Sequence, residues 1–229
     1  MPLNFVSFSA QNVDPLWSYV RLLISGDVGN GAVAFPDAKG HVVTRLGAPV
    51  GDSTRKSPGG NSIRYATKGD GLSITNSTDF DLLGNEFCIE SFNQFDSGIT
   101  SGAVILGRWG IGPNTAADYI FLFNGAKTEF VGGGVDLQST AWTNDGKMHH
   151  FCVERWNGFI ILYIDGVMLA STPIGANIGN SGGRALRTGV WDDGNSGYVG
   201  NQAMIRMTVG AARYKGQNFT IPKSAYPIS

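Results

Sequence analysis

The fold is decided by the stretch Lys147-Met-His-His-Phe-Cys-Val-Glu-Arg-Trp-Asn-Gly-Phe-Ile-Ile-Leu-Tyr-Ile-Asp-Gly-Val-Met-Leu-Ala-Ser171. It predicts two long strands joined by a tight turn at Asn157-Gly158, and a second tight turn at Asp165-Gly166. Both dipeptides are strong hairpin signals, because a type I′ turn needs positive φ at its two central residues. Apolar side chains alternate on either side of the first turn, as the period of a strand requires. The stretch therefore predicts a β-meander.

The residue pattern of this stretch resembles a known family. His150-Phe-Cys-Val-Glu-Arg155, followed by Leu162-Tyr-Ile-Asp-Gly-Val-Met-Leu-Ala170, is similar to the laminin-G-like (pentraxin-like) branch of the concanavalin A-like lectin and glucanase sandwiches. That family has Trp-x-His-Val-Ala-Val-x-Arg, a hairpin, and then Leu-Tyr-Val-Asp-Gly. The resemblance assigns a structural role to the motif residues His150, Arg155, Tyr163, Asp165 and Gly166.

Departures from the family pattern are apolar exchanges. Met148 stands where the family has Trp, and Phe151 and Cys152 replace Val and Ala. A core can accommodate exchanges of this kind by repacking.

Two further blocks extend the resemblance. Asp70–Thr75 with Asp79–Phe92 resembles the family passage "gdyLtip…dFdlg…dFTiEfW", with Cys88 in place of Thr and Phe92 in place of Trp. The ending Gly210-Ala-Ala-Arg-Tyr-Lys-Gly-Gln-Asn-Phe-Thr-Ile-Pro222 resembles the "vaRYtgnFtpP" ending of laminin-G-like domains in structural proteins of tailed bacteriophages. The three blocks stand in the family's order, and the last one implies a virion protein.

Composition agrees with a large all-β domain. The chain has 229 residues, of which 42% are hydrophobic and 11% aromatic, and its 33 glycines are spread along it. Turn residues interrupt about twelve expected strands at regular intervals, the spacing of a sandwich. We expect a two-sheet antiparallel jelly-roll sandwich of the concanavalin A type over residues 19–229. Residues 1–18 lack periodicity and are expected to form an N-terminal arm.

The charge and hydropathy of the chain indicate which partners and which cellular locations to expect. Lys and Arg total 17 against 18 Asp and Glu, a net charge of −1, without a basic cluster that could follow phosphates, so we expect no nucleic acid partner. No signal peptide is evident, and no apolar run approaches the roughly 20 residues of a membrane span. These observations predict a soluble protein made in the cytoplasm, without membrane contact, and the resemblance of the C-terminal block to phage proteins implies that it becomes part of a virion.

The two cysteines, Cys88 and Cys152, each alternate with apolar residues inside an expected strand. This placement favours two small buried side chains, because free cysteine is among the most buried residue types. A disulfide stays open as the alternative, since the sequence does not give the distance between them.

Catalysis is not expected. The glucanase branch carries its acid and nucleophile as Glu-x-Asp-x-x-Glu on one strand, and this spacing does not occur here. Glu86 and Glu90 are four residues apart and would share a face, but Glu90 belongs to the family's structural strand. His149 and His150 are adjacent on a strand and point to opposite faces, so they are not expected to share a metal ion.

One loop is a candidate ligand site. Trp191-Asp-Asp-Gly-Asn195 offers oxygen donors from Asp192, Asp193 and Asn195 beside an indole. Asp192 and Asp193 are weak Ca²⁺ candidates, because related domains bind Ca²⁺ at a loop rim. The alternative is a polar turn, in which Asp, Asn and Gly serve the backbone.

The same loop could bind a sugar through stacking on Trp191. Trp109 and Trp142 also lie near expected strand ends, where an indole can be exposed. For Ca²⁺, Asp118 and Asp136 could join the loop only if the fold brings them there. No other cofactor is indicated.

The resulting hypothesis is a non-enzymatic bacteriophage virion protein of the decoration or cement type, packed against other virion proteins or copies of itself. The alternative is a tail or fibre adhesin module that binds host-surface glycans. A secreted polysaccharide hydrolase is a third possibility, disfavoured by the missing carboxylate motif.

Overall fold

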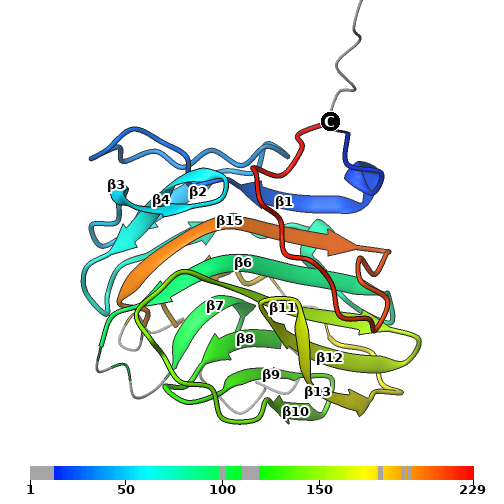
Figure 1. Ribbon diagram of the computed structural model, residues 1–229. Helices are drawn as coiled ribbons and strands as arrows, with labels where there is room; N and C mark the ends of the chain where they lie inside the picture. The colour runs from blue at the N-terminus through cyan, green and yellow to red at the C-terminus, as the bar shows by residue number, and fades with distance from the viewer. Residues whose placement is uncertain are drawn as a thin grey trace, which may run out of the picture.

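The computed structural model describes residues 13–97, 99, 102–109, 119–179, 183–191, 194 and 197–229. This part of the chain forms an all-β sandwich, so the predicted fold class is confirmed (Figure 1). Its elements are η1 (Trp17–Tyr19), β1 (Val20–Ile24), β2 (Val43–Leu46), β3 (Val50–Ser57), β4 (Gly60–Tyr65), β5 (Gly71–Ile74), η2 (Thr78–Phe80), β6 (Phe87–Phe95), β7 (Ala103–Arg108), β8 (Tyr119–Phe123), β9 (Thr128–Gly132), β10 (Val135–Gln138), β11 (His149–Trp156), β12 (Phe159–Ile164), β13 (Val167–Pro173), β14 (Leu186–Thr188) and β15 (Gly200–Val209).

Two antiparallel sheets make up the sandwich. The eight-stranded sheet, sheet A, has the order β13-β12-β11-β6-β15-β4-β3, and β1 also pairs with β15. The seven-stranded sheet, sheet B, has the order β10-β9-β8-β7-β14-β5-β2. Sequence neighbours are often separated by crossovers between the sheets, which is the connectivity of a jelly roll.

The core lies between the two sheets and follows the two-residue period of the strands. On β8, Tyr119, Phe121 and Phe123 point inward and are buried. Phe123 stacks on Phe95 of β6 with ring centroids 4.5 Å apart, which joins the sheets. Alternation of apolar side chains thus produces the sandwich directly.

Both predicted hairpins are present. In the first, Trp156 pairs with Phe159 across a turn in which Asn157 has φ 48° and Gly158 has φ 78°. In the second, Asp165 and Gly166 have φ 51° and 77° between β12 and β13. Positive φ at both central residues is the requirement that identified these dipeptides in the sequence.

Strand β3 (Val50–Ser57) was not predicted, because the sequence there suggested turns. It is an edge strand of sheet A, and its residues Gly51–Lys56 are largely polar. Edge strands carry polar side chains and so lack the alternation that reveals inner strands. Residues 128–138 form two strands, β9 and β10, separated by a turn at Gly133-Gly134.

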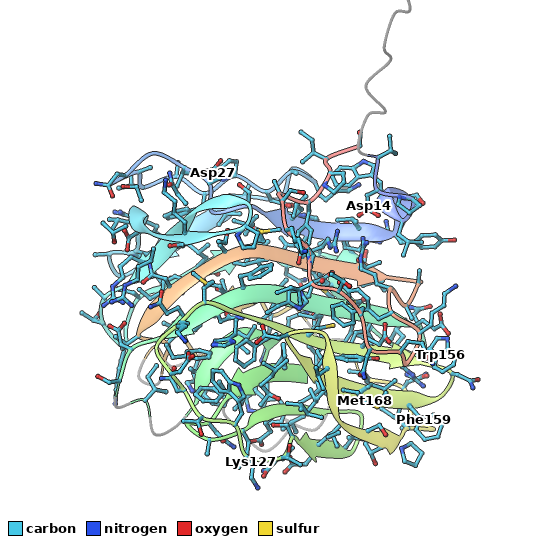
Figure 2. The ribbon with its side chains drawn as sticks, viewed as in Figure 1. Asp14, Asp27, Lys127, Trp156, Phe159 and Met168 are labelled. Carbon is cyan, nitrogen blue, oxygen red and sulfur yellow. The ribbon has the colours of Figure 1, made fainter. Side chains whose placement is uncertain are left out.

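The segments at both ends of the described chain lie on the outer face of sheet A. Residues 211–229 cross this face in front of β15, β6 and β11 (Figure 1). Trp17 packs with Val20, Leu23 and Phe92. Asp14 and Asp27 lie beside β1, whereas Phe159 and Met168 lie on the β12–β13 side (Figure 2). Residues 1–12 of the predicted arm are outside the described part.

Candidate functional site

The outer face of sheet A is closed by a buried ionic cluster. Glu90 of β6 is fully buried, and its carboxylate accepts hydrogen bonds from Arg206 Nη2 at 2.6 Å and Tyr214 Oη at 2.6 Å. Asp14 bonds both Arg206 and Arg213, at 3.1 and 2.8 Å. Burial opposes ionisation of Glu90, but Arg206, His150 and Arg213 outweigh it and hold the pKa of Glu90 well below its ordinary value.

This cluster fixes the C-terminal segment. Tyr214 stacks on Phe219 with centroids 3.4 Å apart, and Glu154 accepts the backbone N–H groups of Tyr214 and Gly216. The Arg-Tyr…Phe pattern at the end of the sequence is therefore a structural clamp. A charge that is buried, paired and fully hydrogen-bonded holds structure together and leaves no free group for a ligand.

The motif residues also hold neighbouring segments together. His150 Nε2 lies 3.0 Å from Glu90 Oε2, and the Tyr163 hydroxyl donates to Glu154 at 2.9 Å. Arg155 donates to the carbonyl of Leu83 at 2.9 Å. Asp165 accepts from the backbone N–H of His150 at 2.9 Å, which ties the second turn to β11.

Gly166 completes this set of contacts. A side chain at Gly166 would collide with the carbonyl of Phe219, and the Phe219 N–H donates to the Gly166 carbonyl at 2.9 Å. Each of the five motif residues to which the resemblance assigned a structural role thus forms contacts within the fold.

The outer face of sheet B is different, because it presents apolar and aromatic side chains. The strand register places Ile120 between Gly107 and Val131, and Leu122 between Val104 and Glu129. Val104, Ile120 and Leu122 form a cluster against which Trp109, Val131 and Trp191 pack, half-buried. Two indoles therefore border an apolar sheet face.

Trp191 is held in a defined position. Its indole Nε1 donates to the Gly102 carbonyl at 3.1 Å, and its own carbonyl accepts from Arg187 Nη1 at 3.0 Å. A Cβ at Gly102 would lie 2.9 Å from the Trp191 Nε1, so glycine permits this close approach. Trp109, Arg187 and Trp191 line one small cavity of about 10 Å³ over β7, β8 and β14.

Trp142 does not belong to this face. Its ring packs on the core aromatics Phe123 and Phe151, and on His149 at 4.9 Å. Of the three tryptophans that the sequence suggested as ligand contacts, Trp109 and Trp191 lie in one cluster on sheet B, whereas Trp142 packs against the edge of the core.

A pair of carboxyl groups also lies on the outer face of sheet B. Glu129 of β9 lies near Asp136 of β10 and accepts a hydrogen bond from Asn124 at 2.8 Å. Burial and the neighbouring Asp136 raise the pKa of Glu129. The sequence alone did not reveal this pair, because the two carboxyl groups become neighbours only through the β9–β10 turn.

The remaining candidate ligands of the Trp191 loop, Asp192, Asp193 and Asn195, lie outside the described residues, as does Asp118. The Ca²⁺ and sugar roles of this loop therefore stay predictions. Asp136 lies on β10, opposite Val131.

Histidine positions agree with separate structural roles. His149 bonds Asp165 at 2.6 Å and Asp145 at 2.8 Å, whereas His150 faces Glu90 on the other side of the sheet. Within the described ranges, no group of three or more His, Cys, Asp or Glu side chains is arranged to hold a metal ion. None of the helices in that part of the chain has the length and hydropathy needed to cross a membrane.

Comparisons with known proteins give similarity of fold only. The sequence matches no protein-family model and no curated protein. The fold is similar to the binding domain of Paraclostridial Mosquitocidal Protein 1, with TM-score 0.65, 9% identity, and coverage of 86% of this chain and 50% of that one. It is also similar to the botulinum neurotoxin serotype D binding domain, with TM-score 0.63, 13% identity, and coverage of 86% and 49%. The chain thus spans about half the length of these toxin domains.

A third similar structure matches over nearly its full length. It is domain 4 of AbnA, an extracellular arabinanase of Geobacillus stearothermophilus, solved in complex with arabinotriose. The TM-score is 0.58 at 14% identity, with coverage of 85% of this chain and 94% of that chain. All three comparisons place the chain among β-sandwich domains.

Proposed function

We propose that this protein is a non-enzymatic binding module that recognises glycans through the outer face of sheet B. The observation that carries the proposal is the pair of half-buried indoles, Trp109 and Trp191, beside the apolar cluster of Val104, Ile120 and Leu122. Sugars present an apolar face that stacks on an indole, while their hydroxyl groups bond to polar side chains at the rim. Arg187 supplies such a polar group.

The structural comparisons support this proposal. One similar domain was solved with a bound arabinose oligosaccharide, and the two toxin domains are described as binding domains. The packing of residues 211–229 supports the choice of face, because this segment covers the aromatic cluster of sheet A, whereas Trp109 and Trp191 remain half-buried on sheet B.

We further propose that the module is displayed on a bacteriophage particle as an adhesin. The support is the resemblance of the ending Gly210–Pro222 to laminin-G-like domains of phage structural proteins. The proposal includes the absence of catalysis, since the Glu-x-Asp-x-x-Glu spacing of the glucanase branch does not occur in the sequence.

A glycan array tests the binding face. The wild-type protein is expected to bind a subset of bacterial surface or plant cell-wall oligosaccharides. Trp109→Ala and Trp191→Ala should each weaken binding about tenfold, a loss of about 1.4 kcal/mol for one stacking contact. Trp156→Ala is the matched control, because Trp156 lies with Tyr214 and Phe219 on the sheet A side. Equal losses in all three variants, or none in the first two, would contradict the assignment.

The decoration role is the second candidate, favoured by exposed apolar side chains near both described ends. Val13 is 54% and Ile228 is 71% exposed, and exposed apolar surface often marks a partner site. The test is the double substitution Val13→Ser and Ile228→Ser, which keeps Asp14 with its arginine partners. A folded protein that no longer associates with particles would support docking through these two ends, and unchanged association would rule it out.

A further inference from the structure

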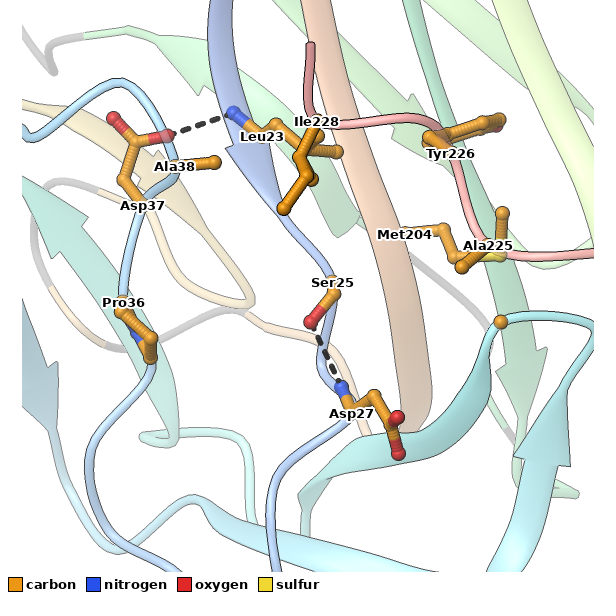
Figure 3. A pocket seen from close by; sticks show the side chains of 11 residues that line it. Leu23, Ser25, Asp27, Pro36, Asp37, Ala38, Met204, Ala225, Tyr226 and Ile228 are labelled. Carbon is orange, nitrogen blue, oxygen red and sulfur yellow. Dashed lines mark hydrogen bonds between the residues drawn. The ribbon is translucent and has the colours of Figure 1, made fainter. Parts of the chain in front are cut away.

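A second hollow lies on the opposite side of the sandwich from the aromatic face of sheet B. It encloses about 310 Å³, within the size range of small-molecule sites (Figure 3). Five segments far apart in the sequence meet there: β1, the loop near Asp37, the β3–β4 turn, β15 and the C-terminal segment. The lining residues are Leu23, Ser25, Asp27, Pro36, Asp37, Ala38, Gly59, Met204, Ala225, Tyr226 and Ile228.

The floor of the hollow is apolar and rigid. Leu23, Met204 and Tyr226 are at least 93% buried and pack in one cluster. The Tyr226 hydroxyl is already bonded to Glu90 at 3.2 Å, so this residue offers mainly ring surface to a ligand. Met204 is fixed at a bulge of β15, with φ 52° and its N–H bonded to the Ser25 carbonyl. Such a surface favours an apolar group.

Both charged side chains that line the hollow are acidic. The Asp37 carboxylate accepts hydrogen bonds from the backbone N–H groups of Leu23, Lys39 and His41, and from the His41 imidazole. These four hydrogen bonds use its capacity as an acceptor. Asp27 is exposed, and its Oδ1 accepts from the Asn61 N–H at 3.0 Å. Asp27 Oδ2 has no hydrogen-bond partner and no cationic neighbour among the described residues, and Figure 3 shows the carboxylate at the rim.

The backbone holds Asp27 in this place. Gly60 has φ 116°, and any side chain there would overlap the Asp27 carboxyl group. The Asp27 N–H donates to Ser25 Oγ at 3.1 Å, which fixes the other side of the residue. The carboxylate is therefore pre-positioned beside the apolar floor.

We propose that this hollow binds a small organic cation, an alkyl chain or ring that carries one protonated amine. The apolar body would be buried against Leu23 and Met204, and the ammonium group would pair with Asp27 at the rim. An anion of the same shape would face two carboxylates, and a neutral analogue would gain only the apolar contact. The site is independent of the glycan face, because it lies on the other sheet.

The test uses NMR of the protein with ¹³C-labelled methionine methyl groups, titrated with hexylammonium, hexanol and hexanoate. The Met204 signal should shift on addition of hexylammonium, while that of Met168, on β13 and outside the hollow, should stay in place. Hexanol should bind about two- to fivefold more weakly, the range for one exposed ion pair, and hexanoate more weakly still. Asp27→Asn should remove the preference for the amine over the alcohol.

A second pair of variants keeps the test decisive. Ala38→Trp places an indole in the hollow and should abolish the Met204 shift, whereas Ala66→Trp, at an exposed alanine outside the hollow, should leave it unchanged. An unperturbed Met168 signal in each variant shows that it is folded. Binding of hexanoate as tight as that of hexylammonium, or binding by Ala38→Trp equal to that of the wild type, would overturn the proposal.

Discussion

Glu90 is the residue on which the closed face of sheet A depends. Its buried carboxylate faces Arg206, Arg213, His150 and two tyrosine hydroxyls. The sequence identified Glu90 as structural from the strand pattern of the family. It could not identify the partners, because Asp14 and Arg206 are separated by almost the whole chain and no local pattern links them.

Replacing Glu90 tests this cluster. Glu90→Gln should lower the free energy of unfolding by about 3–5 kcal/mol, because it removes one of the two carboxylates that balance the buried Arg206 and Arg213 and leaves Asp14 as the other. Chemical denaturation measures the loss. Glu86→Gln is the control at an exposed glutamate, and its effect should stay below about 1 kcal/mol.

The pH dependence of Glu90 has a defined sign. Folding lowers the pKa of Glu90. The contribution of its carboxylate to the free energy of unfolding is therefore complete above the unfolded pKa of about 4.3, and it decreases as the pH falls through the folded pKa. The loss of stability between the wild type and Glu90→Gln should therefore shrink in acid. A constant difference down to about pH 2 would contradict the ionic account.

His149 has the opposite pH dependence. Its hydrogen bond with Asp165 raises its pKa, with a further contribution from Asp145 that together outweigh its partial burial. The contribution of charged His149 to the free energy of unfolding is complete below the pKa of a free imidazole, about 6.5. It is lost as the pH rises through the pKa of His149 in the folded protein. The melting temperature of the wild type should fall over that range, and His149→Gln should flatten the profile. Equal profiles would show that His149 is not charged in the folded protein.

At the scale of elements, the two hairpin turns have the same backbone but different surroundings. Gly158 and Gly166 have φ 78° and 77°. Nothing lies within 4 Å of a Cβ at Gly158, whereas at Gly166 it would collide with the Phe219 carbonyl. The sequence predicted both turns from their dipeptides, but the contact with the C-terminal segment depends on tertiary structure.

A matched pair of substitutions separates the effect of backbone strain from that of the contact with Phe219. Gly158→Val should cost about 1–3 kcal/mol from backbone strain alone. Gly166→Val should cost more than Gly158→Val, because it also displaces Phe219 from the turn. Thermal or urea denaturation of both variants provides the comparison. An equal cost would mean that the C-terminal segment does not depend on this contact.

Cys88 and Cys152 lie on neighbouring strands beneath the same segment. Their sulfur atoms are 3.5 Å apart, and the thiols are free and buried. Burial raises the pKa of both thiols, which lowers their reactivity. The sequence predicted buried side chains but not their proximity, since strand pairing sets it.

A thiol titration checks this arrangement. The native protein should react slowly with a disulfide reagent, and the denatured, unreduced protein should give two free thiols. Phe219→Ala should speed the native reaction by loosening the cover over the cysteines. A count of zero in the denatured protein would establish a disulfide instead.

At the scale of the whole molecule, the two outer faces have different roles. Residues 211–229 cover sheet A with a clamp of charges and aromatic rings, and sheet B carries Trp109 and Trp191 over an apolar cluster. Strand alternation and turn dipeptides were sufficient to predict the sandwich. They could not show which face is covered, because that depends on where the C-terminal segment packs. They likewise could not separate Trp142, which packs on the core, from the two tryptophans on sheet B.

The most direct test of the binding face is NMR of the five indole N–H groups during titration with an oligosaccharide from the glycan array. If sheet B is the binding face, the signals of Trp109 and Trp191 should shift together and saturate. Those of Trp17 and Trp156, on the sheet A side, and of Trp142, against the core, should not move. Saturable shifts confined to Trp17 or Trp156, with Trp109 and Trp191 unchanged, would contradict the account.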